Sequence, residues 1–321
     1  MLCPSLCLVI PCFNESKVIP ITSNLFKEKI CELIKNGKIS KKSKILFVDD
    51  GSSDSTWEII KRLSKENDIF IGIRQSRNRG HQNAVVAGLM TAKEFFDITI
   101  SIDCDGQDDI NAVNDMVESY ISGNEIVYGV RSSRKTDTFF KRFTAESFYK
   151  LLKIMGADIV FNHADYRLVS KRVLDEFENY KEVNLFLRGL FPLIGFKSST
   201  VYYERNERIA GESHYPLKKM LGLAFDGITS LCIKPLRLIA LFGLMLFLFS
   251  MLLFVIMLIL KINKSSVHSW MTVTSVCGLF CSFQLMCSGV IGEYIGKIYL
   301  ETKARPKYII CEKTYSDAEL K

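Results

Sequence analysis

The sequence lacks several patterns that would place it in common functional classes. No Gly-x-Gly-x-x-Gly motif follows any of its β-branched apolar segments, so a dinucleotide-binding site would have no phosphate loop. There is no Cys-x-x-Cys pair and no His-x-x-x-His pair, which excludes the usual zinc sites. The N-terminus has no basic segment before its short apolar run, so we do not expect that run to be a secretory signal peptide.

A strong excess of one charge is also missing. The 321 residues carry a formal net charge of +7, and Lys and Arg are spread along the chain instead of forming a tail. This pattern is only weak support for a nucleic-acid partner, because an anionic membrane surface or a phosphorylated substrate would explain it equally well. The ten cysteines fall in expected strands, helices and the apolar C-terminal region. We interpret them as free, buried thiols in a reducing compartment.

What the first half does contain is an alternation of apolar and amphipathic segments. The apolar segments have the length of buried strands: Leu6–Ile10, Lys44–Val48, Ile69–Ile73, Ile98–Ile102 and Glu125–Val130. Helical patterns lie between them: Lys17–Lys35, Ser55–Lys65, Gln82–Lys93 and Asn111–Ser122. This order predicts an α/β domain whose parallel sheet is covered on both faces. Ligands of such sheets bind at the carboxyl ends of the strands.

Two carboxylates follow the fourth apolar segment directly, in the sequence Asp103-Cys104-Asp105. Carboxylates one residue apart can bind Mg²⁺ or Mn²⁺ together with a diphosphate, because both cations prefer oxygen ligands. An isolated Asp-x-Asp sequence is more often a solvated turn. Here its position at the end of a buried strand favours the metal site.

The first two strand ends also carry polar and turn-forming residues. Asp49 and Asp50 end the second strand, where they can accept hydrogen bonds from a ribose or a base, and Gly51 permits a tight turn. The first strand runs into Pro11-Cys12-Phe13-Asn14-Glu15, where a turn and an aromatic ring can hold a base. We therefore expect a nucleotide at this edge of the sheet.

The C-terminal part holds most of the hydrophobic residues. Leu238–Leu260 is an uncharged run of about 23 residues, roughly 35 Å as a helix and enough to cross a ~30 Å hydrocarbon core. Trp270–Gly292 is as long but less apolar. Lys and Arg flank the outer ends of both runs, while the link Lys261–Ser269 has only two lysines. By the positive-inside rule, this predicts an integral membrane protein with a two-helix hairpin and both termini in the cytoplasm.

Two amphipathic segments precede the predicted hairpin. Thr138–Met155 and Leu217–Ile233 each place apolar residues on one helical face and are flanked by basic residues. A helix covering a protein core is the simpler interpretation of either segment alone, but the second adjoins the predicted span and is expected to lie in the membrane interface. The predicted organisation is a catalytic domain at 1–215, an interface helix at 216–235, two spans within 236–293 and a tail at 294–321.

Four motifs in the first half resemble, in order and spacing, those of inverting family 2 glycosyltransferases with the GT-A fold: Pro11–Glu15, Val48–Ser53, Asn78-Arg79-Gly80 with Asn83, and Asp103–Gln107. Later motifs resemble the polyisoprenyl-phosphate branch of that family: Tyr128–Arg131 with Arg134, Asp165–Leu168, Arg188–Leu190, and Arg208-x-x-Gly211-x-Ser213-x-Tyr215. Together with an Arg-Pro-x-Tyr tail, the resemblance to bactoprenol glucosyltransferases covers essentially the whole chain. Gly106 departs from the usual Leu of the Asp-x-Asp motif but leaves the carboxylates intact.

The resemblance implies a GT-A domain, a nucleotide-sugar donor, Mg²⁺ or Mn²⁺ and a lipid-phosphate acceptor. It assigns the following residues to nucleotide binding: Pro11, Phe13, Glu15, Asp50, Asp103 and Gln107. It assigns the metal to Asp103 and Asp105, and the acceptor phosphate to Arg131, Arg134 and Ser213. The catalytic residues that it implies are Asp105, Asp165 and Arg208.

The implied reaction is an inverting transfer of glucose from UDP-glucose to undecaprenyl phosphate at a bacterial inner membrane, by an enzyme that can form homo-oligomers. The acceptor is already mostly dianionic at neutral pH, so Asp165 is as well suited to orienting the sugar as to acting as a base. Three alternatives stay open: a dolichyl-phosphate mannose synthase-type enzyme using GDP-mannose, a processive polysaccharide synthase and an inactive membrane scaffold. The processive synthase is disfavoured because Asn184–Gly189 lacks the Trp of its Gln-x-x-Arg-Trp motif.

Overall fold

The computed structural model describes residues 3–132, 163–182, 187–206 and 269–320, together with residues 245 and 252. The described strands form an eight-stranded sheet in the order β7-β5-β6-β4-β1-β2-β3-β8. Their bounds are β1 Leu6–Cys12, β2 Lys44–Asp49, β3 Phe70–Gln75, β4 Ile98–Ser101, β5 Ile126–Arg131, β6 His163–Ser170, β7 Ser198–Tyr203 and β8 Ile310–Lys313. The helices are α1 Ile19–Lys35, α2 Thr56–Glu66, α3 His81–Ala92, α4 Ala112–Ile121, α6 Lys171–Phe177, α7 Leu187–Leu193, α10 Ser269–Lys303 and α11 Asp317–Leu320.

The centre of the sheet is parallel, as predicted. β1 pairs in parallel with both β2 and β4, and β2 pairs in parallel with β3. β6 is antiparallel to both β4 and β5, and β7 runs parallel to β5. The five predicted strands correspond to β1 to β5, which confirms the α/β part of the predicted fold.

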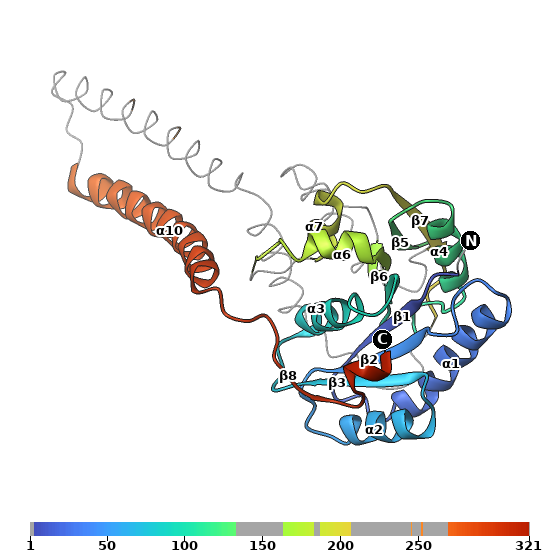
Figure 1. Ribbon diagram of the computed structural model, residues 1–321. Coiled ribbons are helices and arrows are strands. Elements are labelled where there is room, and N and C mark those ends of the chain that lie inside the picture. The colour runs from blue at the N-terminus through green and yellow to red at the C-terminus, as the bar shows by residue number, and fades with distance from the viewer. Residues whose placement is uncertain are drawn as a thin grey trace.

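Helices cover both faces of this sheet (Figure 1). One apolar cluster joins the sheet to α1, α2 and α4, through side chains such as Phe26, Trp57 and Met116. The second cluster joins the opposite face to α3, α6 and α7, through side chains such as Val85, Phe177 and Phe191. The approach of α3 is close, because a Cβ on Gly88 would lie 2.3 Å from Val9 Cγ1. The near-continuous apolar strands thus bury both of their faces, as their sequences indicate.

The C-terminal tail contributes an edge strand that the sequence did not indicate. β8 pairs antiparallel with β3 and covers an edge that would otherwise expose unpaired main-chain groups. The indole Nε1 of Trp57 donates to Glu312 Oε2 at 2.9 Å, and Gly72 N donates to Thr314 Oγ1 at 2.8 Å. Residues of the predicted tail therefore belong to the same sheet as the N-terminal half.

Membrane spans are the part of the prediction that the structure contradicts. No helix among the described residues is both long enough and apolar enough to cross a membrane. α10 has the length, but Gln284 and several Ser and Thr residues make 270–292 less apolar, and Glu293, Lys297 and Lys303 follow it. The predicted hairpin at 238–260 and 270–292 and the integral membrane localisation with cytoplasmic ends are therefore wrong by this finding. Residues 238–260 lie outside the described residues except for 245 and 252, as do the amphipathic segments at 138–155 and 217–233.

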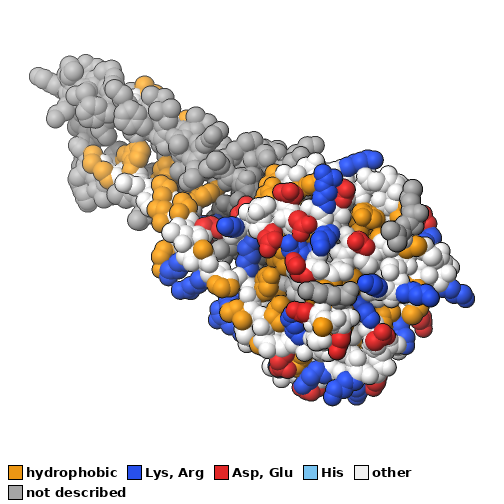
Figure 2. All heavy atoms as spheres, in the orientation of Figure 1, with side chains coloured by type: hydrophobic (Ala, Val, Ile, Leu, Met, Phe, Trp, Pro, Cys, Tyr) orange, Lys and Arg blue, Asp and Glu red, His pale blue; other side chains and the backbone are white. Residues whose placement is uncertain are grey.

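The described surface mixes charges of both signs, and its apolar side chains are most evident along α10 (Figure 2). The exposed apolar residues there include Ile291, Ile295, Ile298, Tyr299 and Leu300. The cysteines whose side chains the structure describes are free, as predicted. Burial was predicted less well, because Cys3, Cys31, Cys277 and Cys311 are exposed.

Candidate active site

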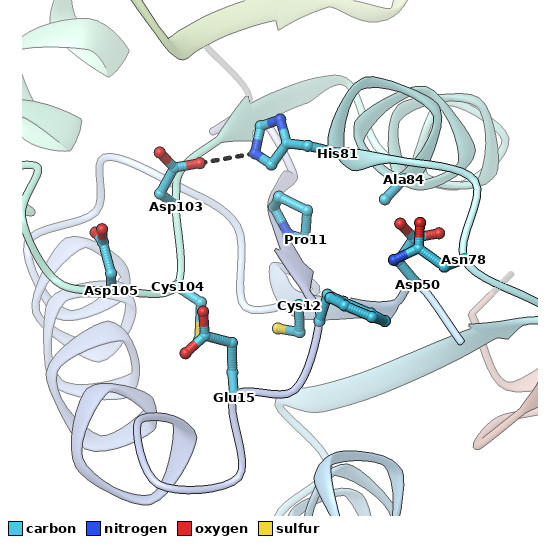
Figure 3. Close-up of a pocket in the computed structure, with 11 residues that line it drawn as sticks. Pro11, Cys12, Glu15, Asp50, Asn78, His81, Ala84, Asp103, Cys104 and Asp105 are labelled. Atoms are coloured by element: carbon cyan, nitrogen blue, oxygen red, sulfur yellow. Dashed lines mark hydrogen bonds and ion pairs between the residues drawn. The ribbon is translucent and has the colours of Figure 1, made fainter. Parts of the chain in front are cut away.

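A pocket of about 400 Å³ lies where β1, β2 and β4 end (Figure 3). Its lining comes from four separate stretches of chain: Pro11, Cys12, Phe13, Glu15, Asp50, Asn78, His81, Ala84, Asp103, Cys104 and Asp105. The chain proceeds from β1 outward to β2 and β3, and then returns to place β4 on the other side of β1. The pocket thus lies at the switch point of the sheet, where ligands of open α/β sheets bind.

The wall formed by residues 13–15 is attached to the loop after β2. Asn14 adopts a left-handed conformation with φ 56°, and its N–H donates to Ser52 Oγ at 2.9 Å. The N–H of Glu15 donates to Thr56 Oγ1, also at 2.9 Å. These bonds fix the turn and leave the Phe13 ring 45% exposed at the pocket. An exposed ring held in this way offers a flat apolar surface to a planar ligand.

Asp50 shapes the loop that leads into α3. Its two carboxylate oxygens accept hydrogen bonds from the N–H groups of Arg79 and Gly80, at 2.8 and 2.9 Å. Burial raises the pKa of Asp50, and these two main-chain bonds oppose that effect. The next residue, Gly51, has φ +67°, and a Cβ there would lie 2.5 Å from the carbonyl carbon of Arg77. Asp50 therefore lines the pocket and also fixes the loop before α3, which forms another part of the pocket lining.

Asp103 and Asp105 lie in the same pocket and provide the hard oxygen donors that Mg²⁺ or Mn²⁺ requires. Burial tends to raise the pKa of Asp103, but the hydrogen bond and charge of His81 outweigh it and lower that pKa. The carboxylate is then ionised, as a metal ligand must be. Among the described residues no group of three or more His, Cys, Asp or Glu side chains forms a complete metal site. The pair fits a cation whose other ligands come from a diphosphate and water.

His81 is a pocket residue that the sequence analysis missed. It is the first residue of α3, and its Nε2 lies 2.9 Å from Asp103 Oδ1 (Figure 3). Desolvation lowers the pKa of His81, but the hydrogen bond to Asp103 and the charges of Asp103 and Asp165 raise it to about 9 overall. The only signal for this residue in the sequence was its place just after Asn78-Arg79-Gly80.

Antiparallel pairing brings Asp165 to the same edge of the sheet. Ser101 on β4 is opposite Arg167 on β6. Because the two strands are antiparallel, extending this register by two residues places Asp103 opposite Asp165. The hydroxyl of Ser101 donates to the carbonyl oxygen of Asp165 at 2.6 Å. The predicted site residues Asp103 and Asp165 are therefore neighbours although 62 positions separate them along the chain (165 − 103).

Two arginines hold the Asp165 carboxylate. Arg167 Nη2 lies 2.9 Å from Asp165 Oδ1, and Arg188 contributes Nε to Oδ1 at 3.3 Å and Nη2 to Oδ2 at 3.1 Å. Burial acts to raise the pKa of Asp165, but the charges of Arg188, Arg167 and His81 hold it well below its usual range. Asp165 is therefore a fixed anion at neutral pH.

Arg131 lies on the side of the site formed by β5 and β7. Its Nη2 is 3.5 Å from Asp108 Oδ1, and its Nε is 3.4 Å from the hydroxyl oxygen of Tyr203. That hydroxyl donates to Asp108 Oδ1 at 2.6 Å. Burial and the negative charge of Asp103 raise the pKa of Asp108 to about 6, against the opposing charge of Arg131. Neither Asp108 nor Tyr203 was anticipated from the sequence.

The remaining predicted residues lie apart from the pocket or outside the described residues. Gln107 Oε1 accepts a hydrogen bond from Arg205 Nη2 at 2.5 Å, and the Gln107 carbonyl accepts one from Asn206 N at 2.8 Å. The segment after β7 is thereby attached to the loop that bears Asp103 and Asp105. Arg134, Arg208 and Ser213 belong to parts of the chain that the structure does not describe.

Comparison with known proteins gives one family and several close relatives. The family model "Glycosyl transferase family 2" matches residues 7–177. The uncharacterized glycosyltransferase YkoT of Bacillus subtilis is 48% identical over 314 residues, which cover 98% of this chain and 93% of the relative. The bactoprenol glucosyl transferase of Shigella phage SfX is 38% identical over 305 residues, covering 94% and 97%.

Among solved structures, glucosyl-3-phosphoglycerate synthase from Mycobacterium tuberculosis has a TM-score of 0.46 and 17% identity, covering 71% of this chain and 79% of that one.

Proposed function

The chain belongs to glycosyltransferase family 2 and is a glycosyltransferase; from this premise we propose that it transfers glucose from UDP-glucose to undecaprenyl phosphate, with inversion at the anomeric carbon. The proposal is supported by relatives named bactoprenol glucosyl transferase, which match this chain over nearly their whole length. The observation that carries it is the pocket in which Asp103 and Asp105 share one space with the exposed Phe13 ring. Metal-binding carboxylates and a flat apolar surface are the two features that a nucleoside diphosphate needs.

The donor nucleotide occupies the pocket at the ends of β1, β2 and β4 in this proposal. Pro11 and Phe13 contact the base, and Glu15 accepts hydrogen bonds from the nucleoside. Asp50 acts partly through the loop that it holds, because both of its oxygens accept main-chain N–H groups. Gln107 contributes from the loop after Asp105, in the catalytic domain that we assign to residues 1–215.

A divalent cation bound by Asp103 and Asp105 would supply Lewis-acid stabilisation of the negative charge on the departing nucleoside diphosphate. Both carboxylates line the pocket, and the hydrogen bond to His81 orients Asp103 within it. Orienting a ligand through a second residue is a common way of fixing a metal site.

The chemical step needs no strong base. A phosphate monoester has a second pKa near ~6 and is mostly dianionic at neutral pH. One of its oxygens attacks the anomeric carbon, and the bond from that carbon to the diphosphate oxygen breaks. Asp165 is kept ionised by Arg167 and Arg188 and would be a weak proton acceptor. We assign it to orienting the sugar.

The acceptor phosphate is proposed to meet Arg131, at the end of β5. Arg131 is fixed by Asp108 and Tyr203, so its guanidinium has a defined position beside the carboxylates of the pocket. A guanidinium matches phosphate oxygens in a bidentate manner. Arg134, Ser213 and Arg208 complete the phosphate contacts in this assignment, which for these three rests on the sequence motif alone.

The test is transfer by purified full-length protein in detergent, with undecaprenyl phosphate and a panel of UDP- and GDP-sugars. The expected product is a lipid phosphate that carries one hexose, identified by mass spectrometry, with UDP-glucose as the preferred donor. A preference for GDP-mannose would change the proposed donor but not the proposed type of reaction. Transfer to a hydroxyl acceptor but not to the lipid phosphate would contradict the proposed function.

A further inference from the structure

Arg188 has a position that the proposed function does not yet use. It lies on α7 and forms a two-bonded pair with Asp165 at 3.3 and 3.1 Å. Its side chain remains 29% exposed, whereas that of Arg167, the other partner of Asp165, is 1% exposed. We propose that Arg188 is a phosphate-binding residue of the active site. This inference rests on the proposed function and assigns a residue to one of its substrate phosphates.

The charges around Asp165 favour an anionic ligand. Two guanidinium groups share this one carboxylate, so the three side chains have a formal net charge of +1. Arg167 is buried, donates to the carbonyl oxygen of Leu187 at 3.0 Å and stacks over the Phe191 ring at 4.7 Å. Arg167 thus holds Asp165 from within the protein core. Of the two arginines, Arg188 is the one that solvent and a ligand can reach.

The main chain beside Arg188 is fixed from two directions. The N–H of Leu187 donates to Gln82 Oε1 on α3 at 3.1 Å, and the carbonyl oxygen of Leu187 accepts from Arg167. Gln82 directly follows His81, which contacts Asp103 in the pocket. These bonds tie the start of α7 to the helix that borders the pocket. A side chain held in this way loses little conformational entropy when it binds a phosphate.

Electrostatic proximity supports the same placement. The charge of Arg188 reaches both His81 and Arg131, where it partly offsets the rise in pKa that Asp103 causes at His81 and that Tyr203 and Asp108 cause at Arg131. Arg188 is therefore near both His81, which lines the nucleotide pocket, and Arg131, the arginine assigned to the acceptor. The environment of Arg131 differs from that of Arg188. The carboxylate that Arg131 contacts, Asp108, also accepts a hydrogen bond from the Tyr203 hydroxyl, and among the described residues no second guanidinium is paired with it.

The ligand chemistry is a phosphate dianion, which the reaction provides twice. One source is the diphosphate of the nucleotide donor and the other is the phosphomonoester of the acceptor. A planar guanidinium can bind two oxygens of either group. Nucleotide binding and acceptor dependence can be measured separately, so an experiment can distinguish the two sources.

The experiment compares wild-type enzyme with Arg188→Gln and Arg188→Lys. One arm measures UDP binding by titration calorimetry with Mn²⁺ and without acceptor. The second arm measures the KM for undecaprenyl phosphate at saturating donor. Loss of a charge-assisted phosphate contact should raise the affected constant at least about tenfold in Arg188→Gln, with partial recovery in Arg188→Lys. The matched control is Arg172→Gln, which removes an exposed arginine paired with Glu125.

A rise in the UDP dissociation constant identifies the donor diphosphate, and a rise in the acceptor KM identifies the phosphomonoester. Both constants within about twofold of wild type would overturn the inference, even if kcat falls. Wild-type enzyme that binds UDP but transfers nothing to the lipid phosphate would contradict the proposed function instead, and the first arm would still test Arg188. Gln82→Met should shift the same constant by a smaller factor, about fivefold, because it removes only the bond that positions Leu187.

Discussion

The two halves of the active site are held in place by different forces. One half, which we call the parallel-strand half, comprises the pocket residues that follow β1, β2 and β4, together with the start of α3. Main-chain hydrogen bonds fix it, such as those from Arg79 and Gly80 to Asp50. The other half, the ion-pair half, comprises Asp165 and Arg131 with their charged partners on β5, β6, β7 and α7.

This difference indicates what each half can tolerate. Main-chain bonds depend on backbone conformation, so the parallel-strand half should be sensitive to steric changes. Buried ion pairs depend on both partners being charged, and removal of one partner leaves an uncompensated charge. The ion-pair half should therefore respond to charge and to pH. Each of the predictions below tests one side of this contrast.

The largest effect is expected at the carboxylate pair of the parallel-strand half. Asp105→Asn removes a charge but little volume, so the protein should fold normally and lose transfer activity by about 100- to 1000-fold in kcat. Excess chelator should abolish the activity of wild-type enzyme as well. The matched control, Asp68→Asn, alters a surface carboxylate whose side chain is 95% exposed and should retain activity. Normal transfer by Asp105→Asn, or by wild type in chelator, would exclude the metal assignment.

A steric change should damage the same half through its backbone. A Cβ on Gly51 would lie 2.5 Å from the carbonyl carbon of Arg77, and Gly51 has φ +67°. Gly51→Ala should therefore lower the free energy of unfolding by about 3 kcal/mol and weaken UDP binding. Gly37→Ala is the control, because Gly37 has φ +68° but nothing within 4 Å of an added Cβ. It should cost only about 1 kcal/mol, as measured by chemical denaturation, and equal losses would show that the close approach does not matter.

The same contrast explains which parts of the site could be predicted from the sequence. In the parallel-strand half most predicted pocket residues lie at or just after the end of an apolar strand, so local sequence order was enough to identify Pro11, Asp50, Asp103 and Asp105. His81 was missed because its role depends on a contact with Asp103 across two loops. The spans were predicted from the length of two apolar runs and from their basic flanks, and the described helices do not support them.

In the ion-pair half the important contacts join distant segments. Asp108 meets Arg131 and Tyr203 only because β5 pairs with β7, and Arg188 meets Asp165 only because α7 packs against β6. No local pattern indicates such pairs. The pairing of β8 with β3 was missed for the same reason, because a short tail strand has no periodicity that specifies its partner. A motif resemblance identified Arg131 and Asp165 but not the side chains that hold them.

Loss of charge in the ion-pair half should have a smaller and more selective effect. Arg131→Ala should raise the apparent KM for undecaprenyl phosphate by about tenfold or more, because a charge-assisted contact typically contributes ~1.5–3 kcal/mol. The KM for the nucleotide sugar should change much less. Arg172→Gln again serves as the control for loss of an exposed arginine. A higher KM for the nucleotide sugar with an unchanged KM for undecaprenyl phosphate would mean that the two phosphate sites have been assigned the wrong way round.

The smallest expected effect is a pH dependence of stability that originates at Asp108. Burial raises its folded-state pKa to about 6, with a contribution from Asp103, while Arg131 and the Tyr203 hydrogen bond oppose the shift. The unfolded value is near ~3.9, so between about pH 4 and pH 6 the unfolded chain has released a proton that the folded protein still holds. Stability therefore falls as the pH rises through this window.

Asp108→Asn cannot ionise, so relative to wild type it should gain about 1–2 kcal/mol in free energy of unfolding between pH 4 and pH 7. Asp115→Asn, on the exposed side of α4, should change this difference by less than about 0.5 kcal/mol. A flat difference for Asp108→Asn in urea denaturation at the two pH values, or one of opposite sign, would show that the Asp108 carboxylate is not destabilised in the folded protein.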